Sequence, residues 1–145
     1  MADDPYAHRI LIVTGTVPRA EDLDRPLAYY LKGEIDRRGG RDPHRRGLVV
    51  ADLWYLQNEH LERRPVISVG GPGVNAVSAA FYRLLPIALA VEDTLVIQMD
   101  PAFEDLRVAV WGMDHDRTQV AVATFAQDLF LGRYLEAVWS GKART

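Results

Sequence analysis

Two glycine-containing segments carry the residues whose chemistry is most suggestive. One reads Gly70-Gly71-Pro72-Gly73-Val74-Asn75, and the other reads Gly112-Met113-Asp114-His115-Asp116-Arg117-Thr118. Each follows an apolar run that is typical of a buried strand. Glycine lets a backbone approach a ligand closely, and a histidine between carboxylates has the groups of an acid–base site. If the two segments meet in space, they predict the two halves of one binding site.

Each segment also has a purely structural interpretation. The first matches neither the dinucleotide-binding nor the P-loop spacing, and no lysine follows it to reach a phosphate. It could simply turn the chain into a helix that Asn75 or Ser78 caps. In the second segment, Asp114 alone could cap a helix, with the acidic residues complementing the helix dipole.

Other chemistry is poorly represented in the sequence. Ser68 and Ser78 lack the setting of an activated nucleophile, and the chain has no cysteine. Its four histidines are scattered, without the spacing of metal ligands. We therefore expect no metal site and no cofactor. One basic cluster follows the first predicted helix. A solvated loop is its default interpretation, and contact with a phosphate backbone is the lesser alternative, because no aromatic residue lies among the arginines to stack on bases. The cluster comprises Arg37, Arg38, Arg41, Arg45 and Arg46.

The elements that must position these groups follow from the apolar pattern. Short β-branched runs predict strands at 9–14, 47–51 and 66–69, and two further runs, at 94–99 and 106–111, predict an antiparallel pair because their connector is too short for a crossover helix. Helices are expected from about 24 to 38, 53 to 61, 75 to 85 and 114 to 139, with Asp24 as the cap of the first. This alternation predicts one α/β domain over residues 1–145, a Rossmann-like or flavodoxin-like three-layer sandwich with a mixed, mostly parallel sheet of about five strands.

Ligands of open α/β sheets bind where the strands end at their carboxyl edge. If the strands are parallel as expected, that edge gathers a tentative binding set. Its members are Thr14, Thr16, Asp52, Gly71, Gly73, Asn75, Ser78, Asp114, His115 and Thr118. The helix N-termini there would offer N–H groups to a small anionic ligand.

The last predicted helix changes its apolar face part way along. Val122, Phe125 and Leu129 share one side, whereas a later set lies nearly opposite, with Gly132 at the changeover. Either the helix breaks and both parts pack on the same domain, or its end meets another molecule. In the second case the predicted interface is Leu131, Tyr134, Leu135, Val138 and Trp139.

Composition limits the choice of partners. A net charge of −3 gives no general attraction to nucleic acid. The N-terminal stretch does not have the pattern of a secretory signal, and the apolar runs are far shorter than the ~20 residues that span a bilayer. We expect a bacterial cytoplasmic protein, or a domain of a longer one, without a membrane or nucleic-acid partner.

The two glycine segments taken together suggest a family. Val66 to Asn75 resembles the VGGP-x-x-N strand and turn of archaeal S-layer-type α/β domains. Val108 to Val122 resembles the G-x-D-x-x-x-T-x-x-A segment that follows it, and bacterial cell-wall-binding repeats have a similar rhythm. The resemblance covers about residues 65–140. It implies an α/β domain that binds or assembles rather than catalyses.

Two functions are therefore carried forward. The first is a non-catalytic domain that acts through protein–protein contacts, as a homo-oligomer or in a larger assembly, and that senses a small anionic ligand. The alternative is a small enzyme for a nucleotide or phosphorylated metabolite, with Asp52, Asp114 or His115 as acid–base groups. The enzyme requires both glycine turns to face one crevice, with His115 directed into it.

Overall fold

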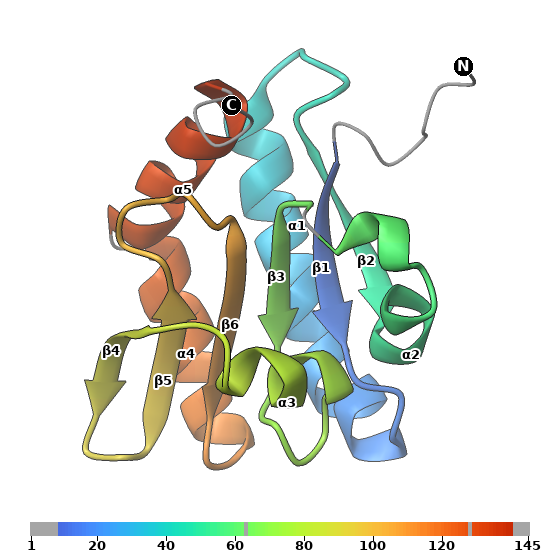
Figure 1. Cartoon of the computed structure of the whole chain (residues 1–145), viewed down its shortest axis with the longest axis vertical. Coiled ribbons are helices and arrows are strands. Elements are labelled where there is room, and N and C mark those ends of the chain that lie inside the picture. Colours follow the sequence, from blue (N-terminus) through green and yellow to red (C-terminus); the bar gives the residue numbers. More distant parts are fainter. Residues whose placement is uncertain (1–8, 63, 128, 141–145) are drawn as a thin grey trace.

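The computed structural model describes residues 9–62, 64–127 and 129–140, so the two ends of the predicted 1–145 domain lie outside it. The described residues form an α/β structure with a mixed six-stranded sheet (Figure 1). The strands are β1 (Arg9–Thr14), β2 (Arg46–Ala51), β3 (Val66–Val69), β4 (Ile87–Val91), β5 (Leu95–Met99) and β6 (Arg107–Gly112). The helices are η1 (Ala20–Asp24), α1 (Arg25–Gly39), α2 (Asp52–Leu56), η2 (Glu59–Leu61), α3 (Ala76–Tyr82), α4 (His115–Gln127) and α5 (Leu129–Ser140).

The strand order is β2-β1-β3-β6-β5-β4. The first four strands in this order are parallel, and Ile12 pairs with both Val49 and Ile67 in their register. β5 runs antiparallel to β6, and β4 runs antiparallel to β5. The expectation of parallel strands followed by an antiparallel pair is therefore confirmed, and the carboxyl ends of β1, β3 and β6 lie at one edge of the sheet.

The prediction of about five strands is wrong by one, because it omitted β4. The run Ile87-Ala88-Leu89-Ala90-Val91 has two alanines, which favour strands weakly. Its five residues are all apolar, so it has no alternation of apolar and polar side chains. It forms the outer edge of the sheet, where only β5 supports it. Pairing with a neighbouring strand, rather than local preference, therefore makes this segment a strand.

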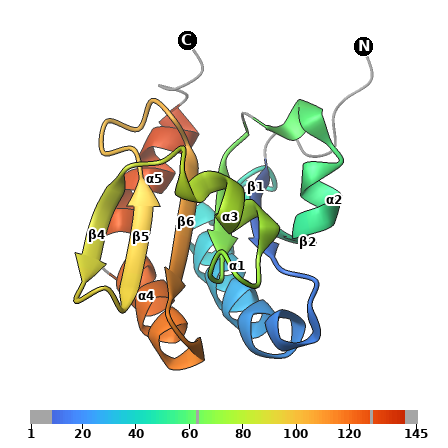
Figure 2. The ribbon, with the colours of Figure 1, turned by 60° about the horizontal axis from the view of Figure 1, so that its bottom comes forward.

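Helices lie on both faces of the sheet (Figure 2). α1, α4 and α5 pack on one face, and α2 and α3 lie on the other. Each face has its own buried apolar cluster, the first around Ile12, Ile67 and Phe125 and the second around Leu11, Val66 and Phe81. Alternate residues of β1 and β3 thus point to opposite faces, as the period of a strand requires.

The structure describes the last predicted helix in two parts, α4 up to Gln127 and α5 from Leu129. Leu131, Tyr134, Leu135 and Val138 are buried in the cluster that α4 also joins, and the Tyr134 hydroxyl donates to the Leu106 carbonyl at 2.9 Å.

Trp139 is half-buried against this cluster, and Arg45 lies over its ring at 5.0 Å. The chain therefore packs both apolar faces on its own sheet. The predicted interface is wrong at Leu131, Tyr134, Leu135 and Val138, because this domain itself buries them, and Trp139 is partly covered.

Candidate functional site

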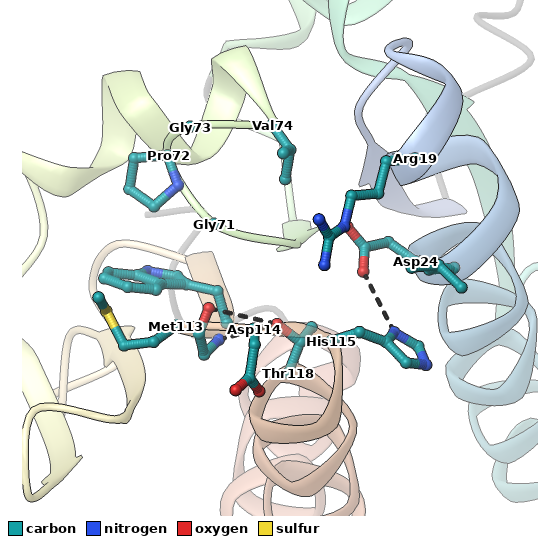
Figure 3. Close-up of a pocket in the computed structure, with 13 residues that line it drawn as sticks. Arg19, Asp24, Gly71, Pro72, Gly73, Val74, Met113, Asp114, His115 and Thr118 are labelled. Atoms are coloured by element: carbon teal, nitrogen blue, oxygen red, sulfur yellow. Dashed lines mark hydrogen bonds and ion pairs between the residues drawn. The ribbon is translucent and has the colours of Figure 1, made fainter.

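Three loops converge at the carboxyl edge of the sheet and enclose a crevice of about 380 Å³ (Figure 3). Its walls are residues 71–74 after β3, residues 111–115 with Thr118 at the β6–α4 junction, and Arg19, Leu23 and Asp24 after β1. The two glycine segments thus line one crevice. In the sheet, β1 lies between β2 and β3, so the order of the strands reverses at β1. The crevice lies beside this reversal point, which is the usual ligand position in open α/β sheets.

Tight glycine contacts hold the loops together. A side chain on Gly15 would meet the Val74 carbonyl oxygen at 1.8 Å, so the loops after β1 and β3 touch backbone to backbone. Gly70 has φ of +109°, and a side chain there would lie 2.7 Å from a carboxylate oxygen of Asp24. A side chain on Gly112 would meet the start of α4 at 2.4 Å. At these positions glycine is a requirement of packing.

Gly71 and Gly73 are different. A side chain on Gly73 would meet nothing within 4 Å, and one on Gly71 would make only ordinary contacts, at 3.6 Å and beyond. Neither residue has a positive φ. The fold does not require glycine at these two positions, yet both line the crevice. Their lack of side chains keeps the crevice open.

Half of the predicted binding set builds the loops and does not line the crevice. Asp52 is buried and accepts three hydrogen bonds, from the Thr16 hydroxyl at 3.0 Å, the Leu53 amide at 2.7 Å and the Ala76 amide at 2.8 Å. It therefore joins the loops that follow β1, β2 and β3. Thr14 is buried at the end of β1.

Asn75 is a second internal clasp. Its Nδ2 donates to the carbonyls of Val13 and Val69, and its Oδ1 accepts from the amides of Val77 and Ser78. The Ser78 hydroxyl lies 2.7 Å from that of Ser68. These bonds occupy the first N–H groups of α3, so the expectation that this helix N-terminus offers them to an anion is wrong.

The β6–α4 junction is also capped internally. The Asp114 carboxylate accepts from the Arg117 amide at 2.8 Å, and the Thr118 hydroxyl accepts from the Gly112 amide at 3.0 Å. Asp114 is thus the helix cap that the sequence indicated as one alternative. Gly71, Gly73, Asp114, His115 and Thr118 are the members of the predicted set that the crevice brings together.

Asp24 is the residue that sequence reasoning missed. It was expected to cap α1, but its side chain forms no capping hydrogen bond. It is 6% exposed and forms no hydrogen bond with any other described residue; its nearest partner is His115, whose Nδ1 lies 3.9 Å from Oδ1. Burial raises the pKa of the Asp24 carboxyl, and the neighbouring His115 and Arg19 oppose part of that rise. The signal for the position of Asp24 in the crevice is its contact with Gly70, and this contact cannot be seen in the sequence.

His115 completes the polar wall of the crevice. Figure 3 shows its ring turned toward Asp24, with the Arg19 side chain on the other side of that carboxylate. The Nδ1 atom of His115 is buried and has no hydrogen-bond partner in the described part of the chain. The crevice therefore has one carboxylate, that of Asp24, which accepts no hydrogen bond from the described residues, whereas the His115 nitrogen beside it is buried.

Other surfaces offer less chemistry. A larger cavity of about 780 Å³ lies between α5 and the ends of β4 and β5, with arginine as its only charged residue type. Within residues 9–62, 64–127 and 129–140, no three His, Cys, Asp or Glu side chains come together as metal ligands would. No helix in those ranges is both long and apolar enough to cross a membrane.

Comparison with models of known protein families finds no match, and a search of curated protein sequences also finds none. The site must therefore be interpreted from its own geometry.

Proposed function

We propose that this chain is a non-catalytic α/β binding domain that holds a small polar ligand in the crevice and acts through contacts with other protein molecules. The observation that carries the ligand site is Asp24, a buried carboxylate without a hydrogen-bond partner among the described residues. It faces a crevice in which the fold does not require glycine at positions 71 and 73. A carboxylate in this position can accept hydrogen bonds from a ligand in the crevice.

A crevice-filling variant tests this proposal. Gly73→Leu places a side chain in the opening, whereas Gly33→Leu places one on α1, where it would also meet nothing within 4 Å. Amide chemical shifts are followed by NMR while a library of small polar fragments is added. We expect fragments that shift the crevice amides of the natural chain and the Gly33→Leu variant, but not those of Gly73→Leu. Fragments that bind all three alike, or no binding at all, would contradict the proposal.

The protein–protein part of the proposal rests on β4. Ile87 and Val91 are 57% and 41% exposed, and β4 is the last strand of the sheet, with one edge free of any described strand. Residues 87–91 carry no charge and no proline, the devices that normally protect an edge strand. We propose that the occupant is β4 of a second copy in antiparallel pairing, which keeps the two acidic Glu92-Asp93 turns apart, whereas parallel pairing would bring them together.

Light scattering across a concentration series tests this interface. We expect the natural chain to dimerise and Val91→Lys to remain monomeric. Val120→Lys is the matched control, because Val120 is similarly exposed, at 46%, but lies on α4. A natural chain that stays monomeric at high concentration, or a Val91→Lys variant that dimerises equally well, would refute the β4 interface.

We also propose a more specific fold class and a cellular location for this chain. The order β2-β1-β3 with helices on both faces supports a flavodoxin-like or Rossmann-like three-layer arrangement. The resemblance to S-layer-type domains supports binding and assembly over catalysis. We propose a bacterial cytoplasmic setting on the sequence pattern alone.

The enzyme is kept as a second candidate because Asp24 faces His115 at 3.9 Å. A carboxylate beside an imidazole can orient it and stabilise its charged form during proton transfer. In this hypothesis the pair is Asp24 and His115, and Asp52 is structural. Phosphate release from nucleotides or sugar phosphates that is lost in both Asp24→Asn and His115→Gln would favour it; turnover that survives both changes would exclude this pair.

A further inference from the structure

The Asp24 carboxylate specifies what kind of ligand atom fits beside it. Asp24 lacks a hydrogen-bond donor, although its side chain is more than nine-tenths buried. An ionised carboxylate only accepts hydrogen bonds. Its distance of 3.9 Å from His115 Nδ1 is too long for a hydrogen bond. A ligand that satisfies Asp24 must therefore bring a donor.

Charge narrows the choice of donor. The Nδ1 of His115 is buried on the same wall and is closed to a ligand, so the partner of the donor is Asp24. An uncharged hydroxyl can donate to it. An ammonium group only donates and would add a positive charge near Arg19, whereas a phosphate would be repelled by the Asp24 carboxylate.

The opposite wall is apolar. Pro72, Met113 and Trp111 line it, and Gly71 and Gly73 leave the backbone between them uncovered. A volume of about 380 Å³ falls in the range of small-molecule pockets. The crevice thus has a wall that suits a flat or ring-shaped apolar surface and a polar wall that suits a hydroxyl.

We propose that the crevice binds an uncharged ring compound that bears hydroxyls, a sugar or a nucleoside, and that one ring hydroxyl donates to Asp24. This inference rests on the proposed ligand site and names the chemical class of its ligand. It replaces the small anionic ligand, because the N–H groups at the start of α3 are already bonded within the chain.

Paired probes test the class by NMR titration of the Gly71, Gly73 and Gly112 amides. Adenosine is compared with 9-(tetrahydrofuran-2-yl)adenine, and methyl glucoside with 2-methoxytetrahydropyran, so that the second member of each pair keeps the rings and lacks the hydroxyls. Inorganic phosphate and phenethylamine are the charged probes. We expect adenosine or methyl glucoside to bind at least tenfold more tightly than its hydroxyl-free counterpart, since one hydrogen bond to a charged group is worth about a factor of ten or more.

A variant connects the effect to Asp24. Asp24→Asn should weaken the binding of the hydroxyl compound about tenfold. Asp22→Asn is the matched control, because Asp22 lies on the same turn but is exposed, and it should leave binding unchanged. Preference for the adenosine pair identifies a nucleoside as the source of the hydroxyl, and preference for the glucoside pair identifies a sugar.

The outcomes distinguish two claims, the chemical class of the ligand and the existence of the ligand site. If phosphate, phenethylamine or the hydroxyl-free rings shift the crevice amides as strongly as the hydroxyl compounds do, the hydroxyl class is wrong and the ligand site stands. If none of these probes, and no fragment of the wider library, shifts those amides, both the class and the ligand site are wrong.

Discussion

At the scale of single residues, two buried aspartates at the same edge of the sheet have opposite roles. Asp52 is 3% exposed and satisfied by three donors from three loops, which is what a structural carboxylate requires. Asp24 is comparably buried and has no hydrogen bond within the described residues. A group that the fold leaves unsatisfied lowers stability, and such groups persist where function needs them.

Asp24→Asn should therefore stabilise the protein near neutral pH. The folded-state pKa of Asp24 is raised above the ordinary 3.8, so the folded state binds the proton more readily than the unfolded state between these two values. Stability contributed by this group is lost as pH rises through the raised pKa and regained as pH falls. We expect a gain of about 1 kcal/mol at pH 7, which shrinks toward pH 4, by urea denaturation.

The control for this change is Asp22→Asn, which alters the same formal charge at an exposed position and should change stability little at either pH. A loss of stability in Asp24→Asn at pH 7 would show that the Asp24 carboxylate has a structural partner after all. A gain of stability combined with weaker ligand binding is the result expected of a functional carboxylate.

Asp52→Ala should have the opposite effect. It removes three hydrogen bonds to a carboxylate and leaves the Thr16 hydroxyl and two amides without their partner. We expect a loss of about 2–4 kcal/mol in the free energy of unfolding. Urea denaturation measures it, and Asp22→Ala is the exposed control. An unchanged midpoint would mean that the three loops do not depend on this residue.

At the scale of elements, glycines separate into those that hold the loops together and those that keep the crevice open. Gly15 brings the loop after β1 against the loop after β3, and Gly112 lets α4 start close to β6. Gly71 and Gly73 make no such contact. The sequence shows all four as glycines, but only the contacts of the folded chain distinguish the two kinds.

Gly15→Ala and Gly73→Ala provide a direct comparison. The methyl group of the first would lie 1.8 Å from the Val74 carbonyl oxygen, so the two loops must separate. We expect a loss of about 1–3 kcal/mol from this overpacking. Gly73→Ala meets nothing within 4 Å and should keep stability within about 0.5 kcal/mol. Urea denaturation checks both, and equal effects would contradict the distinction.

The difference between local sequence pattern and contacts in the folded chain explains how far the sequence could predict the structure. The strands β1, β3 and β6 are continuous apolar runs, so local pattern located them and the edge at which they end. β4 depends on pairing with β5, and Leu131 and Leu135 are buried by contacts with residues far away in the chain. The roles of Asp24 and Asp52 depend on which loops meet, a long-range property that one sequence does not reveal.

At the scale of the whole molecule, one sheet separates two apolar clusters. The first contains Leu135 and packs under α1, α4 and α5; the second contains Leu61 and packs under α2 and α3. Because β1, β3 and β6 supply residues to both clusters, loss of either one removes the support of the shared strands. The two faces should therefore unfold together, as one cooperative unit.

The three tryptophans make this cooperativity measurable. Trp54 and Trp111 lie on the face of α2 and α3, whereas Trp139 lies on the face of α5. Fluorescence of a Trp139→Phe variant then reports only the face of α2 and α3, and circular dichroism reports all the helices. Leu135→Ala and Leu61→Ala, one in each cluster, should each cost about 2–5 kcal/mol. Each should lower the urea midpoint seen by both signals equally, with an unchanged slope. If Leu135→Ala instead shifts the circular dichroism transition and leaves the fluorescence transition of the opposite face in place, the two faces are separate folding units and the single-domain prediction is wrong.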